Sequence, residues 1–446
     1  MNQERRVVIT GLGVVTPFGM GAEPLWAGLV EKRSGIRRID VFDPSGFPAQ
    51  VGGQIDGLKM ADYVPKSYRK STKVMAKDIE IAVACAYLAA KDAGIKTRCL
   101  LERGEEEGPS NIDSARFGAN IGSGLICTDL TELAAALATS LDEQGNFSLK
   151  KWGDEGMSNL TPLWLLKFLP NMLACHVTIV HDAQAPSNTL TCGEASSHLA
   201  IGEAMRTIAR GDADICICGG AESKLNPMGL IRQGMLGRLS AKYNDDPGSA
   251  CRPFAADRDG SVISEGGGLL IIEELEHARA RKARIYCELC GFGASGNSRS
   301  WSKPDPEGRG IAGSLSLALA DASCEAETVD MIVAQGLGTV DHDLAESAAF
   351  HSVFGKRTPT IPVLAIKGAI GNNGAGSGAV DVAAGVLAMR NNTIPPSPNT
   401  KQVDEACGLH VIHGDPIDAR LDTVVSSSFA LSGGQAASLV FRRLQE

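Results

Sequence analysis

The alternation of strand and helix signals predicts an α/β protein made of two similar halves. In both halves, short runs rich in Val and Ile are followed by longer segments whose apolar residues recur at helical spacing. Strands separated by helices favour a mainly parallel sheet that is buried on both faces. We place the boundary near a charged helix end, so that residues 1–279 form the first half and residues 280–446 the second.

The first half begins with a β-branched strand at residues 7–10, which Gly11 and Gly13 are expected to end. An Ala-rich helix is expected over residues 74–93, and Gly94 suits its left-handed end. Residues 139–157 are polar and contain glycine, which predicts a surface loop. The other expected elements are helices at 25–30 and 195–210 and strands at 117–121 and 215–218.

The second half repeats the same order of signals. Strands are expected at residues 285–289, 331–334, 363–366 and 424–428, and helices at 312–322, 344–354 and 379–389. Each of the first three strands is followed by a helix, so this half is expected to fold like the first.

Composition limits the classes of partner. The chain has 446 residues, of which 43% are hydrophobic, enough for one large core. A formal net charge of −9 and the lack of a Lys/Arg run argue against nucleic acid and anionic membrane surfaces. Residues 1–6 lead into a strand without a signal peptide, and no stretch is apolar enough to span a membrane. Twelve scattered cysteines are then expected to be reduced, which favours a cytoplasmic location.

Two glycine-rich stretches resemble cofactor loops but are incomplete. Gly11-Leu12-Gly13 lacks the third glycine of a dinucleotide-binding fingerprint. Lys367 precedes the glycine-rich residues 371–378, whereas the lysine of a Walker A loop closes it. We therefore expect neither NAD nor a nucleotide, and read both stretches as sites of close backbone packing.

Two pairs of cysteines raise the question of a metal or redox site. Cys216 and Cys218 alternate on one face of an apolar strand, as a buried wall requires. Cys287 and Cys290 have the spacing of a zinc or redox pair, but no second pair accompanies them. Both pairs are interpreted as structural, and no metal site is expected.

Short motifs are spread in order along nearly the whole chain. They are residues 5–13, 211–214, 219–222, 252–254, 258–260 and 265–266, then Gly336, Thr339, Asp343, Glu346, Lys367, Ser428-Phe429 and Gly433-Gly434. Together they resemble the β-ketoacyl-acyl carrier protein synthases of the thiolase superfamily, in particular ketosynthase II-like members. The resemblance implies a thiolase-like fold, in which duplicated α/β halves form a five-layered αβαβα architecture.

The resemblance also implies which residues should do chemistry. Family members attack an acyl thioester with a cysteine at a helix N-terminus, and two histidines assist decarboxylation of a malonyl extender. In this chain Glu194 stands at the cysteine position, eight residues before Gly202, and Gln335 and Asn372 stand at the histidine positions. Gln and Asn cannot exchange protons near neutral pH. The retained framework of the site is Thr339, Asp343, Glu346, Lys367 and Phe429.

Two residues at the degenerate position leave alternatives open. Glu194 is favoured as a structural plug that caps the helix or binds Gln335, Asn372 or Lys367, over a role as a weak nucleophile. Cys192 could serve as a nucleophile if the turn carries an insertion, but we interpret it as the buried last residue of a strand. The aromatic gate of the family is absent, because residues 430–435 read Ala-Leu-Ser-Gly-Gly-Gln.

One inactive subgroup fits these losses. The chain resembles the chain-length factors of type II polyketide synthases, which pair with an active ketosynthase and shape its product tunnel, although they usually carry glutamine where this chain has Glu194. The resemblance implies a heterodimer with an active ketosynthase in fatty acid or polyketide biosynthesis, and contact with the phosphopantetheine arm of an acyl carrier protein. The alternatives are a condensing, decarboxylating or hydrolysing enzyme of acyl-carrier thioesters that uses Cys192 or Glu194, and a silent acyl-binding homodimer.

Overall fold

The fold is organised around one twisted mixed sheet of twelve strands. The computed structural model describes residues 5–445, so Met1–Glu4, part of the segment expected to lack a signal peptide, lie outside it. The first half contributes β1 (Val7–Thr16), β5 (Phe117–Ser123), β6 (Ser187–Leu190), β7 (Ile215–Ser223) and β8 (Glu265–Glu274). The second half contributes β9 (Cys287–Gly296), β10 (Met331–Val333), β11 (Pro362–Leu364), β15 (Thr423–Phe429) and β16 (Gln435–Arg442).

The two halves share one strand order. It runs β6-β5-β7-β8-β1 in the first half and β11-β10-β15-β16-β9 in the second, and β1 pairs with β9 to join them. Two short strands are added: β2 (Gly19–Met20) beside β1 and β13 (His410–Val411) beside β11. This identity of order and of pairing direction is what a duplicated unit produces.

The expectation of a mainly parallel sheet is wrong in its details. In each half two strand pairs are parallel and two are antiparallel, as β5·β7 and β7·β8 illustrate. The turn between β15 and β16 is only residues 430–434, too short for the crossover that a parallel pair needs. The antiparallel strands β8 and β16 had no counterpart among the expected strands.

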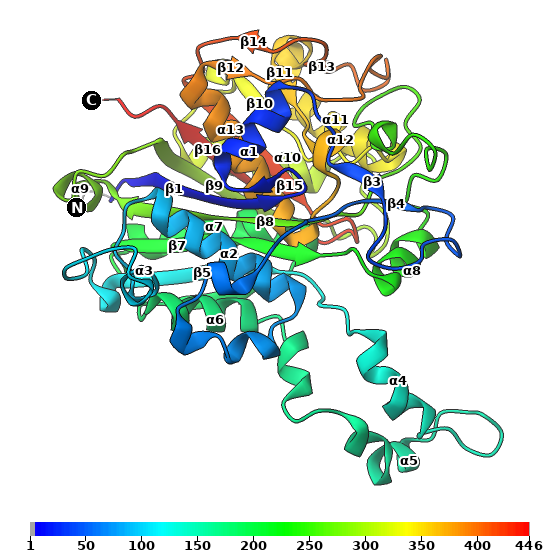
Figure 1. Cartoon of the computed structure of the whole chain (residues 1–446). Coiled ribbons are helices and arrows are strands. Elements are labelled where there is room, and N and C mark those ends of the chain that lie inside the picture. The colour runs from blue at the N-terminus through cyan, green and yellow to red at the C-terminus, as the bar shows by residue number, and fades with distance from the viewer. Residues whose placement is uncertain (1–4, 446) are drawn as a thin grey trace.

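Helices complete five layers, as expected (Figure 1). The middle layer holds α7 (Ser196–Ala209) and α13 (Ser377–Asn391), which pack against each other and against strands of both halves. The outer layer of the first half is formed by α2 (Lys77–Asp92), α3 (Arg98–Arg103) and α6 (Met172–His181), and that of the second by α10 (Arg309–Asp321) and α11 (Val340–Phe354). The αβαβα architecture is thereby confirmed.

Smaller elements fill the connections between these layers. They are α1 (Ala22–Val30), β3 (Ile36–Arg38), β4 (Val51–Gly53), α8 (Pro227–Met235), α9 (Leu275–Ala280), α12 (Lys367–Ile370), β12 (Thr393–Ile394) and β14 (Ile417–Asp418). The boundary proposed between residues 279 and 280 falls at the end of α9 and stays a prediction.

Strand β1 continues through the two glycines that were expected to end it. A Cβ atom at Gly11 would lie 2.5 Å from the carbonyl oxygen of Ala89, and one at Gly13 would lie 2.0 Å from that of Cys85. Both contacts come from α2, so the glycines allow this helix to pack closely on the strand. The prediction that the strand ends at Gly11 and Gly13 is wrong. These glycines instead allow close backbone packing between β1 and α2.

The two cysteine pairs lie in strands. Cys216 and Cys218 are buried in β7 and belong to the same core cluster. Cys287 and Cys290 lie three residues apart in β9, so their side chains face opposite sides of the sheet and pack in different clusters. Within residues 5–445, no group of three or more His, Cys, Asp or Glu side chains could hold a metal ion.

An arm projects from the body of the first half (Figure 1). It contains α4 (Leu130–Ala138) and α5 (Leu149–Asp154), so the loop expected at residues 139–157 is partly helical. Apolar side chains are exposed along the arm, among them Leu137, Leu141, Phe147, Leu149, Leu163 and Leu165. In the part of the chain that the structure describes, no helix has the length and apolarity to cross a membrane.

Candidate functional site

The two middle helices begin at the same place, and Glu194 lies at the start of one of them. A 3-10 turn, η7 (Gly193–Ala195), precedes α7, and a second, η11 (Gly374–Gly376), precedes α13. The two turns contact each other, and Ser197 donates a hydrogen bond to the carbonyl of Ala375. Gly193 has a φ of +59°, a left-handed conformation that lets the chain turn sharply into α7. Glu194, next along, is buried at 3% exposure.

The carboxylate of Glu194 is held by three donors from three different segments. Its Oε1 accepts hydrogen bonds from Lys224 Nζ at 2.5 Å and from Asn372 Nδ2 at 3.2 Å. Its Oε2 accepts one from the backbone N–H of Leu431 at 3.2 Å. Burial raises the pKa of Glu194, but the charge and hydrogen bond of Lys224 outweigh it and hold the pKa at about 2. Glu194 is therefore ionised at neutral pH.

Gln335 is locked to the backbone of Phe429. Its Nε2 donates to the Phe429 carbonyl at 3.0 Å, and its Oε1 accepts from the Phe429 N–H at 2.6 Å. Gln335 is fully buried, and its link to Glu194 runs through Ser428, whose hydroxyl lies 2.9 Å from the Glu194 carbonyl and 3.0 Å from Gln335 Oε1. Both ends of the amide are thus satisfied by the chain itself.

Asn372 binds Glu194 with one end of its amide and the start of α13 with the other. Its Oδ1 accepts hydrogen bonds from the N–H of Gly374 at 2.9 Å and from the Ser377 hydroxyl at 3.1 Å. Gly374 lies in the turn that leads into α13, and Ser377 is the first residue of that helix. Asn372 therefore fixes the position of α13 relative to Glu194.

Two buried carboxylates hold the loop that carries Gln335. Glu346 accepts from the N–H groups of Gln335 and Gly336, and Asp343 from those of residues 337 and 338. Burial raises the pKa of Glu346 to about 7 and that of Asp343 to about 6. Lys367 is also fully buried, but it pairs with Asp381 and not with Glu194.

The turn at residues 430–434 is tied down at Leu431. While its N–H binds Glu194, its carbonyl accepts hydrogen bonds from Arg238 Nη2 at 2.6 Å and from His342 Nε2 at 3.3 Å. The Nδ1 atom of His342 lies 2.9 Å from the Thr339 hydroxyl, and burial lowers the pKa of His342, which favours the neutral ring. A surface cavity of about 380 Å³, lined by Arg238, Thr339 and His342, lies outside this turn.

Comparison with known families identifies the chain. It matches the N-terminal domain of β-ketoacyl synthases over residues 4–278 and their C-terminal domain over residues 286–401. The chain belongs to the β-ketoacyl synthase family. A 3-oxoacyl-[acyl-carrier-protein] synthase 2 of Coxiella burnetii is 34% identical over 443 residues, which cover 99% of both chains.

Solved structures of synthases share the thiolase-like fold. The ishigamide ketosynthase/chain length factor superposes with a TM-score of 0.83 at 28% identity, covering 99% of this chain and all of that one. A type II polyketide synthase acyl carrier protein in complex with its ketosynthase, bound to a hexaketide, gives a TM-score of 0.81 at 28% identity and the same coverage. The fold expected from the resemblance is thereby confirmed.

Cys192 takes no part in the hydrogen bonds that join Glu194, Gln335 and Asn372 to their partners. It follows β6, whose last residue is Leu190, and it is half-buried, so the expectation of a buried last strand residue is wrong. The β6 strand ends early because the chain turns at Gly193, and the Cys192 N–H binds the Ser196 hydroxyl at 2.8 Å. Burial raises the pKa of the Cys192 thiol, which disfavours the thiolate that a nucleophile requires.

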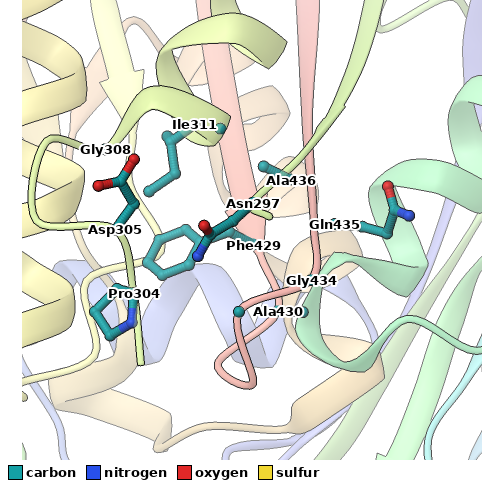
Figure 2. Close-up of a pocket in the computed structure, with 12 residues that line it drawn as sticks. Asn297, Pro304, Asp305, Gly308, Ile311, Phe429, Ala430, Gly434, Gln435 and Ala436 are labelled. Carbon is teal, nitrogen blue, oxygen red and sulfur yellow. The ribbon is translucent and has the colours of Figure 1, made fainter. Parts of the chain in front are cut away.

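A small cavity lies beside the turn at residues 430–434 (Figure 2). Asn297, Asp305 and Phe429 surround it, together with Ala430 and Gly434 of the turn. Its volume of about 20 Å³ holds roughly one water molecule. It is too small for an acyl chain.

The sequence reasoning did not identify Lys224, Arg238 or His342 as members of the site. A signal for Lys224 existed, since Glu222, Ser223 and Lys224 follow the end of an apolar strand and alternate residues share a face. Nothing in the local sequence marks Arg238 or His342, because both act through the backbone carbonyl of a distant turn.

Proposed function

We propose that this chain is a non-condensing subunit that pairs with an active β-ketoacyl synthase and acts like a chain-length factor, in polyketide or fatty acid biosynthesis. One observation carries the proposal. The position at the start of α7 is filled by an ionised carboxylate, Glu194, that Lys224, Asn372 and Leu431 hold in place. No thiol stands there, and no imidazole stands at residues 335 or 372.

The contacts of Glu194 also argue against chemistry by this residue. Attack on a thioester would draw the carboxylate away from Lys224, which is itself buried at 7% exposure. Leaving a buried charge without its partner costs about 3–5 kcal/mol. The product would be a mixed anhydride that water hydrolyses, and Gln335 and Asn372 could not supply protons for the remaining steps. A structural role for Glu194 therefore fits better than a nucleophilic one.

A surface for the active partner is available on the first half. Strand β6 lies at one end of the sheet, and its first residues, Ser187 and Asn188, are exposed. An exposed edge strand presents N–H and C=O groups to which another strand can pair. The projecting arm adds the exposed apolar side chains named above, of which Leu149 at 78% is the most exposed of those six. We propose that an active ketosynthase subunit covers both.

The descriptions of two structural neighbours suggest the type of complex that this chain forms. One solved neighbour is described as a ketosynthase/chain length factor, and another as a ketosynthase in complex with its acyl carrier protein. By analogy, the partners proposed here are an active ketosynthase and an acyl carrier protein that delivers the growing chain on its phosphopantetheine arm. The chain itself has no resident cofactor in this proposal.

The test is co-expression with the nearest encoded ketosynthase that keeps the cysteine and both histidines. We expect native mass spectrometry to show a 1:1 complex, which elongates acyl thioesters from malonyl-carrier protein while this chain alone does not. Elongation by the purified chain without a second subunit contradicts the proposal, and so does a stable homodimer that does not bind the ketosynthase.

The alternative enzymes are tested on the same material. Intact-mass analysis after incubation with acyl-carrier thioester reports an adduct on Cys192 or Glu194, and we expect none. The variants Cys192→Ser and Glu194→Gln assign any adduct that appears. Turnover of malonyl-carrier protein by the chain alone, lost in either variant, would replace the proposal with a decarboxylase or hydrolase.

A further inference from the structure

A cavity of about 590 Å³ lies where the arm joins the body. Its walls come from the arm, with Leu130 and Phe168, and from the segment that follows β7, with Leu225 and Met228. The lining also includes the buried carboxylates of Asp78 and Glu265. The cavity is separate from the small one beside Phe429, and it adjoins the surface proposed above for the partner.

The wall segment at the end of β7 faces two sites at once. Ser223 and Leu225 line the cavity, and Ser223 is anchored there because its N–H donates to Asp78 at 3.1 Å and its hydroxyl to Glu265 at 3.0 Å. Lys224, between them, is not part of the lining and reaches in the other direction to Glu194. This alternation is what an extended chain produces.

The backbone of Lys224 carries the next part of the wall. Its carbonyl accepts the N–H of Asn226 at 2.9 Å, and the Asn226 side chain caps α8 by accepting the N–H of Gly229 at 2.8 Å. A Cβ atom at Gly229 would lie 2.1 Å from the Lys224 carbonyl, so the first turn of α8 packs directly on this residue. A shift of Lys224 therefore moves both Leu225 and the start of α8.

From this arrangement we propose that Glu194 and Lys224 are positioning residues for the cavity wall, and that their ion pair sets the length of the chain the complex makes. The second part of this statement rests on the proposed function. Glu194 holds the side chain of Lys224 on the side away from the cavity. Asp78 and Glu265 hold Ser223 on the cavity side. Glu194 acts through Lys224 and touches no substrate.

The ion pair is well suited to this role because both members are buried, where loss of one charge leaves the other without its partner. Lys224 lies beside one other carboxylate, Glu222, whose charge also favours the charged form of Lys224. Loss of the Glu194 charge leaves Glu222 as the remaining partner for the ammonium group. We expect the lysine, and with it residues 223–229, to shift in that direction.

The first experiment measures the wall directly, without the partner. Hydrogen exchange followed by mass spectrometry over residues 223–235 is compared for the wild type, Glu194→Gln and Lys224→Met. We expect at least about tenfold faster exchange in both variants, because the local opening free energy falls. The matched control is Glu273→Gln, which removes another buried ion pair, that of Glu273 with Arg281, remote from the cavity.

The control separates positioning from general stability. Glu273→Gln should lower the unfolding midpoint while leaving exchange at residues 223–235 unchanged. If a single variant fails to fold, the double variant Glu194→Gln/Lys224→Met removes both buried charges together, and fast exchange in this segment is still expected. Unchanged exchange in the folded variants overturns the positioning role.

The second experiment measures product length in the 1:1 complex. Glu194→Gln should shift or broaden the distribution of acyl chain lengths relative to wild type, whereas Glu273→Gln should not. An unchanged distribution from a complex whose wall segment exchanges faster overturns the link to chain length. Failure to form any complex contradicts the proposed function instead, and leaves the exchange result to decide the positioning role by itself.

Discussion

The starts of the two middle helices differ in the state of the carboxylate that each one meets. Glu194 lies in the turn before α7, and Glu222, from the end of β7, accepts the N–H of Ala375 before α13 at 2.6 Å. Both carboxylates are buried, yet the pKa of Glu194 is lowered to about 2 while burial raises the pKa of Glu222. The difference is Lys224, which donates its hydrogen bond to Glu194. A specific partner, and not depth of burial, decides the direction in which each carboxylate's pKa is shifted.

The largest expected effect comes from removing the shared lysine. Lys224→Met leaves the Glu194 carboxylate buried without its cation, and we expect a loss of about 3–5 kcal/mol in the free energy of unfolding. Urea denaturation at pH 7 measures it. Lys242→Met, at an exposed lysine, is the control and should change stability by less than about 0.5 kcal/mol. Equal stability of Lys224→Met and wild type contradicts this account of the two helix starts.

The second prediction is the pH dependence of Glu194→Gln. At pH 7 we expect the variant to be less stable by about 1–3 kcal/mol, because glutamine keeps an acceptor but loses the ion pair. The folded-state pKa of Glu194 lies below its ordinary value of 4.5, so its stabilisation is present above that pH and is lost as the pH falls toward about 2. Wild type and variant should therefore converge in acid denaturation curves. A gap that persists at low pH rules out the ion pair as its origin.

The resemblance to the synthase family predicted the five layers, and apolar periodicity predicted the order of helices, because it reports which face of an element is buried. It missed β8 and β16, whose starts are rich in Gly or Ala, as Gly266–Gly268 of β8 illustrates. Small residues carry a weak strand signal, yet here they let helices pack closely on the sheet, since a Cβ atom at Gly268 would contact Ala379 of α13.

The site was predictable only as far as ordered motifs could place it. Their spacing located Glu194, Gln335 and Asn372, and the structure brings Glu194 and Asn372 within hydrogen-bond distance. The sequence could not tell which lysine pairs with Glu194, since Lys224 and Lys367 both lie close in sequence to the motifs that have lost their catalytic residues. Lys367 pairs with Asp381 on its own half, which leaves Lys224 for Glu194.

The third prediction concerns Asp78, whose carboxylate is buried. Burial, and then the charge of Glu222, raise the pKa of Asp78 to about 7. A raised carboxyl pKa means that stability declines as the pH rises from about 4 to about 7. Asp78→Asn keeps an acceptor for the Ser223 N–H and has no charge to bury, so it should stabilise the protein by about 1–2 kcal/mol at pH 8 and by less at pH 4. A variant that is less stable than wild type at pH 8 shows that Asp78 is ionised without penalty.

The smallest expected effect is that of Glu222→Gln, the counterpart of Glu194→Gln at the other helix start. Burial raises the pKa of Glu222, so its charge stabilises the folded state less than that of Glu194 does, and a glutamine oxygen can still accept the N–H of Ala375. We expect the free energy of unfolding at pH 7 to change by less than about 1 kcal/mol. The two isosteric changes, measured side by side in urea, test whether Lys224 belongs to Glu194 alone. If Glu222→Gln lowers the free energy of unfolding as much as Glu194→Gln does, Lys224 stabilises both carboxylates equally. The proposed difference between the two helix starts is then wrong.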